Sequence, residues 1–395
     1  MSGWRGLPQE AASLYAEAVA LRRDFHAHPE PSFQEHRTAE RVTEYLDRLG
    51  LKVIPRVGKT GVVALLEGGR PGRTVLLRAD MDALPIEEQN EVPYRSQTPG
   101  WMHACGHDGH TTIGLLAAKL LAQHREKLPG QVKFAFQPAE EIVQGAQAMI
   151  ADGVLDDPPV EAAFGLHLWS LSPVGELAAR PGPILAANDT LHVRIHGRGG
   201  HGAMPHQTAD PIVAAAETVL ALQTIVSRSV PPEERAVLSV GTLHGGSAVN
   251  VIPQTAELSG TIRTMERSVQ KRIHQRVRTL IEGIAQAYEC RAEVEIVQDC
   301  PAVVNDPEAT RLVAETAQAL YGPQAYREHP GLMASEDMAF FLQRVPGCFF
   351  FLGAAPEGRE PAPHHHPQFD INERALPIGA AMLAALAWRF LEAQA

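Results

Sequence analysis

The feature that most limits the fold of this chain is the alternation of apolar strands with amphipathic helices. Runs such as "TGVVALLEGG", "RTVLLRADMDALP", "GQVKFAFQPAEE" and "EAAFGLHLWS" are bounded by glycine, proline or polar residues, which is typical of buried strands. The stretches "EHRTAERVTEYLDRLG" and "HTTIGLLAAKLLAQHREKL" repeat apolar residues every three or four positions, which predicts helices. A further helix is expected over roughly residues 9–28, before the prolines of "HPEPSF". This alternation predicts an α/β fold with helices on both faces of a sheet.

A second pattern interrupts the first between residues 184 and 297. Here the expected elements follow in the order β-α-β-β-α-β, which is the ferredoxin-like arrangement. The first pattern then resumes with two helices, the strand "CFFFLGAA" and a C-terminal helix from about Asn372. We therefore expect one domain made of residues 1–183 and 298–395, with an inserted α+β domain at 184–297. Glu336 and Asp337 begin one of the late helices, where acids favour the helix dipole, so we expect them to cap it.

Composition excludes several classes of protein. The 395 residues carry a formal net charge of -11 with no block of Lys or Arg, which argues against nucleic acid or anionic membranes as partners. No apolar run reaches the roughly 18 to 20 residues of a membrane span, and the N-terminus lacks a signal-peptide pattern. Four cysteines in so long a chain do not form a disulfide scaffold. We expect a cytoplasmic protein.

Five clusters of residues that bind metals follow predicted strands or lie in loops. Ligand sites in open α/β sheets form at the carboxyl ends of strands, so these clusters are expected to meet. Cysteine, histidine and carboxylate side chains are ligands of zinc and similar ions, and two such ions together can polarise a carbonyl and activate water. The clusters are "DMD" (Asp80, Asp82), "HACGHD" (Cys105, His107, Asp108), "PAEE" (Glu140, Glu141), "GLHLW" (His167) and "HHHPQFD".

Two of these clusters decide between kinds of chemistry. Cys105 can be read as a nucleophile, a disulfide partner, a metal ligand or a small buried residue. Glu140 and Glu141 are adjacent at a strand end, so one carboxylate can bind metal while the other faces the substrate as a general base. An exposed acidic turn is the alternative for that pair. A cysteine hydrolase would leave the paired glutamates without a purpose, and a non-catalytic metal-binding protein would need no base.

These motifs resemble those of the M20 metallopeptidase and amidohydrolase family. The resemblance rests on "RRDFHAHPEPSFQEH", "RADMDALP", "HACGHDGH", "QPAEE", "GRGGHGAMPH" and "HHPQFDINE", which run in order from residue 22 to 373. The subgroup is the N-acyl-amino-acid amidohydrolases, which includes hippurate hydrolases and plant indole-acetyl-amino-acid hydrolases. The resemblance implies a zinc-peptidase-like catalytic domain with a mixed sheet, and an inserted ferredoxin-like domain that serves as a lid and usually dimerises.

The resemblance also implies roles for individual residues. Asp82 is similar to an acid that orients a ligand histidine, and Glu140 to the general base. Within the triplet of histidines near the C-terminus, the one two positions before the proline matches the ligand. The implied metal ligands are Cys105 as a bridging thiolate, His107, Glu141, His167 and His365.

In the inserted domain, "GRGGHGAMPH" sets His201 between glycines, which permits a close backbone approach. In the family this histidine reaches the partner subunit's site and steadies the oxyanion. Asn250 and Arg263 resemble groups that hold the substrate carboxylate or carbonyl.

The implied activity is metal-dependent hydrolysis of N-acyl-L-amino acids, with a dipeptidase or carboxypeptidase as the alternative. The expected cofactors are two divalent ions, with zinc favoured over manganese, cobalt or nickel, and the expected assembly is a homodimer through the lid.

Overall fold

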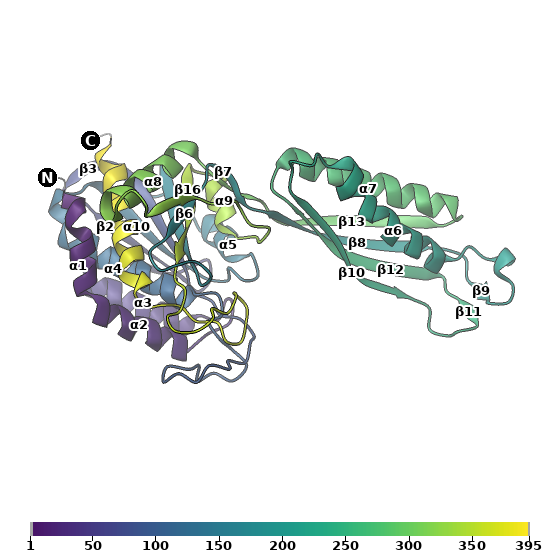
Figure 1. Cartoon of the computed structure of the whole chain (residues 1–395), viewed down its shortest axis with the longest axis horizontal. Coiled ribbons are helices and arrows are strands. Elements are labelled where there is room, and N and C mark those ends of the chain that lie inside the picture. Colours follow the sequence, from purple (N-terminus) through teal and green to yellow (C-terminus); the bar gives the residue numbers. More distant parts are fainter. Residues whose placement is uncertain (1–2, 394–395) are drawn as a thin grey trace. The chain divides into compact units, whose positions relative to one another are not determined.

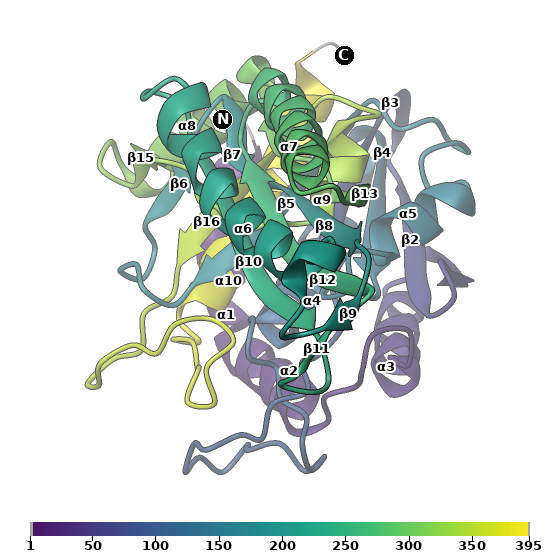
Figure 2. The same ribbon diagram turned by 90° about the vertical axis from the view of Figure 1, so that its right-hand side faces the viewer.

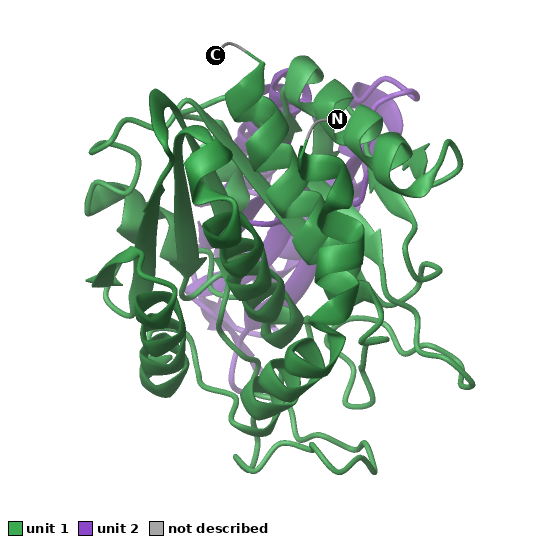
Figure 3. Ribbon diagram, turned by 90° about the vertical axis from the view of Figure 1, so that its left-hand side faces the viewer, with its two compact units in different colours: residues 1–184, 304–330, 337–395 green, residues 185–303, 331–336 purple. Residues whose placement is uncertain are grey.

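The computed structural model describes residues 3–393, which form two compact units. Unit 1 comprises residues up to 184, residues 304–330 and residues from 337 onward, and unit 2 comprises residues 185–303 and 331–336 (Figure 3). The chain leaves and re-enters unit 1 along two short paired strands, β7 (Gly182–Leu185) and β14 (Val303–Asn305). The division into a catalytic domain of residues 1–183 and 298–395 and an inserted lid domain of residues 184–297 stays a prediction.

Unit 1 is built on an eight-stranded mixed sheet in the order β1-β2-β4-β3-β5-β16-β6-β15. Helices such as α1, α4, α8 and α10 lie around it (Figure 1). The pairs β3–β4, β3–β5, β5–β16 and β6–β15 are parallel, whereas β1–β2, β2–β4 and β6–β16 are antiparallel. The central strands are nearly all apolar and are buried on both faces, as a covered sheet requires. The strands are β1 (Lys52–Val57), β2 (Gly61–Glu67), β3 (Arg70–Asp80), β4 (Pro129–Gln137), β5 (Ala162–Trp169), β6 (Leu177–Ala179), β15 (Tyr326–Glu328) and β16 (Gly347–Gly353).

Helices cover both faces of this sheet. Within β5, the Leu168 side chain faces Gly109 on α4, and a side chain at Gly165 would meet Met338 on α9. Side chains an odd number of positions apart on a strand point to opposite faces, so α4 and α9 flank the sheet from opposite sides. The helices are α1 (Leu7–Ser13), α2 (Tyr15–Ala27), α3 (His36–Arg48), α4 (His107–Gln123), α5 (Gly145–Ala151), α8 (Pro307–Tyr321), α9 (Met338–Leu342) and α10 (Ala375–Glu392), with short 3-10 turns at Gly3–Gly6 and Arg125–Lys127.

Unit 2 has the element order β-α-β-β-α-β around an antiparallel sheet in the order β10-β12-β8-β13. Helices α6 and α7 lie together on one face of that sheet (Figures 1 and 2). Along β8, Leu191 and Val193 are buried beneath the helices, whereas the alternating His192 and Arg194 are exposed. The elements are β8 (Ala187–His196), β9 (Gly200–His201), a 3-10 turn (Pro205–Gln207), α6 (Pro211–Ser229), β10 (Ala236–Gly245), β11 (Val251–Ile252), β12 (Thr255–Thr264), α7 (Arg267–Ala287) and β13 (Arg291–Cys300).

Two helix boundaries differ from those expected from the sequence. The single helix expected near residues 9–28 is two helices, because Leu14 takes ψ near 3° and its N–H donates to the carbonyl of Ala11 in a tighter turn. Helix α4 begins at His107 rather than at His110. Gly106 precedes it with φ 92°, a left-handed conformation that glycine adopts without strain. The "HACGHD" cluster therefore straddles a helix start.

Candidate metal centre

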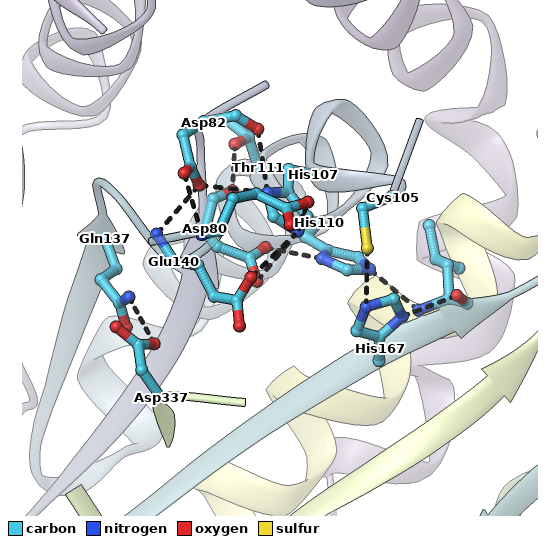
Figure 4. A network of polar contacts seen from close by, with 12 residues as sticks. Asp80, Asp82, Cys105, His107, His110, Thr111, Gln137, Glu140, His167 and Asp337 are labelled. Carbon is cyan, nitrogen blue, oxygen red and sulfur yellow. Dashed lines mark hydrogen bonds and ion pairs between the residues drawn. The ribbon is translucent and has the colours of Figure 1, made fainter. Parts of the chain in front are cut away.

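The polar clusters meet at one edge of the unit 1 sheet. Strands β3, β4 and β5 are parallel neighbours, so their carboxyl ends lie together. Asp82 follows β3, Glu140 and Glu141 follow β4, and His167 lies near the end of β5. Figure 4 shows side chains from these strand ends and from the start of α4 pointing toward one another.

Among the described residues, five groups of side chains are close enough to hold a metal ion, and three of them contain the expected ligands. The ligand atoms of each group all lie within 4.8 Å of one another. Cys105, His107 and Glu141 each belong to two of these three groups, so the three form one continuous cluster. The three groups are Cys105–His107–His167, Cys105–Glu141–His365 and His107–Glu140–Glu141. The structure therefore brings together all five ligands expected from the sequence, with Glu140 beside them.

Both inner histidines are oriented to offer Nε2 as a ligand atom. The Nδ1 of His107 lies 2.9 Å from the backbone oxygen of Asp82, and the Nδ1 of His167 lies 2.8 Å from the carbonyl oxygen of Leu168. A carbonyl can only accept, so Nδ1 carries the proton and Nε2 has the lone pair. The Nε2 of His167 lies 3.4 Å from the Sγ of Cys105, which points at the ring (Figure 4).

Two atoms of the cluster have no hydrogen-bond partner within the described residues, although they are buried. They are the Nε2 of His107 and the Oε1 of Glu141, which lie 3.8 Å apart. An unpaired buried polar atom costs about 1–3 kcal/mol, and bound metal ions would satisfy both. The donor set of one thiol, imidazoles and carboxylates is the set that zinc prefers, so the residues fit a divalent ion.

The backbone turns the three consecutive histidines near the C-terminus toward different partners. His365 has φ 63° and its Nε2 lies 3.4 Å from the Oε2 of Glu141. His364 instead stacks on Trp169, with its Nε2 3.0 Å from the carbonyl of Leu168. The ring of His366 accepts the N–H of Gln368 within its own turn. Of the three, His365 has the geometry of a ligand.

Asp82 holds the segments that carry two of the candidate ligands. Its Oδ1 lies 3.2 Å from the Nδ1 of His107 and accepts the N–H of Glu140 at 3.1 Å. Its Oδ2 accepts the N–H of Glu141 at 3.1 Å and the hydroxyl of Ser32 at 2.7 Å. Burial opposes ionisation of Asp82, but the hydrogen bonds from His107 and these other donors outweigh it and keep the pKa of Asp82 below its ordinary value.

Electrostatics at Cys105 distinguish a ligand from a nucleophile. Burial raises the pKa of the thiol well above its usual value, and the nearby Glu141 carboxylate adds to this effect. Catalytic cysteines show the opposite, a thiol pKa lowered by cationic neighbours. The pKa of Glu141 is also raised by burial, to about 8. Both groups lose their protons readily only beside a strong positive charge, such as a metal ion.

A buried network beneath the site was not found by reasoning from the sequence. The Nδ1 of His110 donates to Asp80 at 2.6 Å, and its Nε2 accepts the N–H of Leu168 at 2.8 Å, so both ring nitrogens are used. Arg78 donates to Asp80 at 2.6 Å and to Asp337 at 2.9 Å. A charged residue, Arg78, inside the apolar run "RTVLLRAD" is the sequence signal from which such a network could have been inferred.

Asp337 was expected to cap the helix that it begins, and that prediction is wrong. It stands at the N-cap position of α9, but its side chain makes no capping bond. It accepts Arg78, the Nε2 of Gln137 at 2.7 Å and the backbone N–H of Ala146 at 2.9 Å instead (Figure 4). The carboxylate therefore ties the end of β4 and the start of α5 to β3.

The other predicted site residues belong to unit 2. His201 on β9 pairs with Val251, next to Asn250, whose carbonyl accepts the N–H of Gly202 at 2.8 Å. Arg263 lies apart from them on β12, where it donates to Ser335 at 3.2 Å. Unit 2 therefore brings His201 and Asn250 together but not Arg263.

Comparison with known proteins identifies the class to which this fold and cluster belong. The model of peptidase family M20/M25/M40 matches residues 76–389. A protein of Bacillus subtilis (strain 168) described as an amidohydrolase, YhaA, is 44% identical over 94% of each chain. A Staphylococcus aureus structure described as an aminohydrolase has a TM-score of 0.95 at 36% identity, covering 99% of this chain and all of the other. The Bacillus subtilis YXEP structure, titled a dinuclear metal-binding peptidase of family M20, has a TM-score of 0.86 at 35% identity, covering 96% and 99%.

Further relatives carry more specific names. An N-acetylcysteine deacetylase of Bacillus subtilis is 38% identical over 96% of this chain and 98% of its own. An IAA-amino acid hydrolase of Arabidopsis thaliana is 40% identical over 95% and 86%, and a thermostable carboxypeptidase of Saccharolobus solfataricus is 39% identical over 94% and 95%.

The chain is a hydrolase. In particular, it belongs to peptidase family M20/M25/M40 and is a metal-dependent amidohydrolase of that family. The family resemblance and the α/β fold with a mixed sheet, both expected from the sequence, are confirmed.

Proposed function

We propose that the chain hydrolyses the amide bond of N-acyl-L-amino acids and releases a carboxylic acid and a free amino acid. The observation that carries this proposal is the convergence of three ligand groups through shared Cys105, His107 and Glu141, with Glu140 beside them. Relatives named for N-acetylcysteine and for IAA-amino acids support an acylated amino acid as the substrate. A carboxypeptidase is the second candidate, because a relative carries that name and a peptide bond is also an acyl amide.

The proposed cofactors are two divalent ions, most naturally zinc, with manganese, cobalt and nickel as alternatives. Bound at the cluster, they would supply Lewis-acid activation of the amide carbonyl and of a water molecule. The chain itself presents four ligands from buried positions, namely one thiolate, two oriented imidazoles and one carboxylate, and a third imidazole from the more exposed His365. The proposed ligands are Cys105, His107, Glu141, His167 and His365.

Glu140 is the proposed general base. Its carboxylate is nearly buried, and its Oε2 lies 4.0 Å from the Nε2 of His107. The bond from its own N–H to Asp82 fixes the backbone that carries it. In the reaction Glu140 takes the proton of the attacking water and then delivers it to the departing amine nitrogen.

His201 is the proposed donor to the oxyanion. Its Nδ1 accepts the N–H of Ala203 at 3.0 Å, so the neutral ring carries its proton on Nε2 and can donate there. The side chain is exposed in the single chain. Asn250, beside it, and Arg263 are the proposed contacts to the substrate, with the Arg fork suited to a free carboxylate.

We further propose a cytoplasmic homodimer formed through unit 2. Strand β10 is a sheet edge, and residues 241–250 along and after it are exposed. On the neighbouring helix α6, Val213 and Leu220 are 47% and 66% exposed. An apolar helix face beside an unpaired strand edge is typical of a surface covered by a second subunit. In such a dimer His201 would serve the partner's site.

The test is substitution of the base. Glu140→Gln should reduce kcat by at least about 10³-fold while two metal ions per chain remain bound. Glu44→Gln, which changes an exposed glutamate, is the matched control. Activity and metal content are measured on acetyl, benzoyl, indole-acetyl and long-chain acyl amino acids and on dipeptides. Near-normal turnover by Glu140→Gln would remove the assignment, and turnover of dipeptides alone would favour the peptidase.

A further inference from the structure

The turn between β4 and α5 carries both Glu140 and Glu141, and its backbone is unusual. Ala139, which precedes them, has φ 51°, and Val143, which follows, has φ 57°. Residues with a Cβ rarely adopt this left-handed conformation and keep it only where the surroundings hold them. Ala139 is also fully buried, so its N–H must find an acceptor inside the protein.

That acceptor is the side chain of Glu35, which is distant in sequence. The Oε1 of Glu35 accepts the N–H of Ala139 at 2.9 Å. Next to it, Asp82 accepts the N–H groups of Glu140 and Glu141, each at 3.1 Å. Three consecutive amides of the turn therefore donate to two buried carboxylates.

Glu35 is itself held firmly in place. It is fully buried, its Oε1 also accepts the N–H of Phe33 at 3.0 Å, and its Oε2 accepts the hydroxyl of Thr60 at 2.5 Å. It occupies the N-cap position of α3, where acids commonly cap their own helix, but its side chain makes no capping bond. Its carboxylate is turned away from the helix and toward the turn at Ala139.

We propose that Glu35 is a positioning residue for this hydrolase: it fixes the backbone at Ala139 and thereby aims Glu140 and Glu141. The inference rests on the proposed roles of those two glutamates. The role requires a hydrogen-bond acceptor at Oε1 rather than a negative charge. A glutamine in the same rotamer would keep its oxygen on Ala139 and turn its amide toward Thr60, whose hydroxyl can accept.

The environment agrees with a role that needs no charge. Burial raises the pKa of Glu35 to about 7. The hydrogen bond from Thr60 lowers this pKa, whereas the negative charge of Asp82 raises it further. A neutral side chain at this position is therefore compatible with the fold near neutral pH.

The experiment compares Glu35→Ala with Glu35→Gln in the metal-loaded enzyme. Glu35→Ala should lower kcat by about 10- to 100-fold with KM within about twofold, since a small displacement of catalytic groups has effects of that size. Hydrogen exchange followed by mass spectrometry on a peptide spanning residues 138–145 should become faster. Glu35→Gln should restore both to within about threefold of the parent.

Asp306→Ala is the control for a general loss of stability. It removes the carboxylate that accepts the N–H of Ala309 and caps α8, outside the site, and should change neither kcat nor exchange at residues 138–145. If Glu35→Ala gives no folded protein, Thr60→Val is used. It frees the Oε2 of Glu35 alone and should give a few-fold loss of kcat with faster exchange in the same peptide.

The outcomes separate this inference from the proposed function. Unchanged exchange at residues 138–145 in the folded variant refutes the positioning role, as does a Glu35→Gln variant as impaired as Glu35→Ala. If Glu140→Gln proves active, the proposed base is wrong. The exchange comparison then still decides whether Glu35 holds the turn.

Discussion

Arg22 offers a quantitative test of how the site is supported. Its guanidinium is fully buried and lies 2.8 Å from Asp108, 2.7 Å from Asp370 and 3.6 Å from Glu373. Asp108 follows the candidate ligand His107, and Asp370 ends the loop of the C-terminal histidines. Replacing Arg22 by Met keeps much of the volume but removes the guanidinium from the fully buried Asp108, which keeps His26 at 2.7 Å, whereas Asp370 keeps Arg359 at 3.1 Å and Glu373 keeps Arg23 at 2.7 Å. Breaking a buried ion pair from one side costs about 3–5 kcal/mol, and because these partners remain we expect Arg22→Met to lower the free energy of unfolding by the lower end of that range, about 3 kcal/mol, at pH 7.

The pH dependence of this loss has a defined sign. Burial opposes ionisation of Asp108 and Asp370, but the Arg22 guanidinium outweighs it and holds the pKa of each below its usual value. Their stabilising contribution is present above the unfolded pKa of about 4 and is lost as the pH falls. In Arg22→Met the pKa of Asp108 should lie nearer its usual value, so the variant has less of this contribution to lose. The difference in unfolding free energy between parent and variant should therefore narrow as the pH falls below about 4.

The assay is urea denaturation followed by tryptophan fluorescence. All four tryptophans, Trp4, Trp101, Trp169 and Trp388, lie in unit 1, so the signal reports the unit that contains Arg22. The control is Arg311→Met, which removes an exposed arginine with ion pairs of 2.6 Å to Glu308 and Glu315. Exposed pairs contribute little, so the control should be nearly as stable as the parent. If both variants lose equal stability, the argument from burial is wrong.

Three further predictions concern the site and its support. Cys105→Ser should lose bound metal and activity together, whereas Cys348→Ser, at another buried cysteine, should keep metal content by elemental analysis. Gly145→Ala should destabilise unit 1, because the added Cβ would lie 1.5 Å from the carbonyl oxygen of Pro138, and a lower urea midpoint would report it. His110→Phe leaves the buried N–H of Leu168 unpaired, whereas Asp80 keeps its bond from Arg78, so the variant should lose about 1–3 kcal/mol of unfolding free energy by the same measurement; an unfolding free energy equal to that of the parent would contradict that role.

The fold class and the convergence of the clusters were predictable because they follow from local pattern. Apolar strands that end in acidic or histidine residues define both the sheet and its polar edge, as at Asp80 and His167. Parallel pairing then brings those ends together without any knowledge of side-chain conformation. The general rule of sites at carboxyl strand ends was therefore sufficient for these residues.

Other features depend on long-range pairs, which a local sequence pattern does not contain. The choice of His365 over its two neighbours came from the family motif, whereas its φ of 63° is visible only in the structure. Asp337 was expected to cap a helix because its local sequence suits that role, but Arg78 lies nearby only after folding. Glu35 likewise reads as the start of a helix, and nothing local indicates that it binds Ala139.

These long-range pairs share one arrangement, in which three of the segments that carry candidate ligands are held by buried charged residues outside the ligand set. Glu35 and Asp82 hold the turn at 139–141, and Arg22 links the start of α4 to the C-terminal loop. Such contacts fix the ligand atoms before an ion arrives, so less ordering is needed on binding. Substitutions in this outer layer should therefore weaken metal affinity by about 10- to 100-fold even though no ligand is removed. Arg22 should affect His107 and His365 together, because it contacts both segments, whereas Glu35 should affect Glu141 alone.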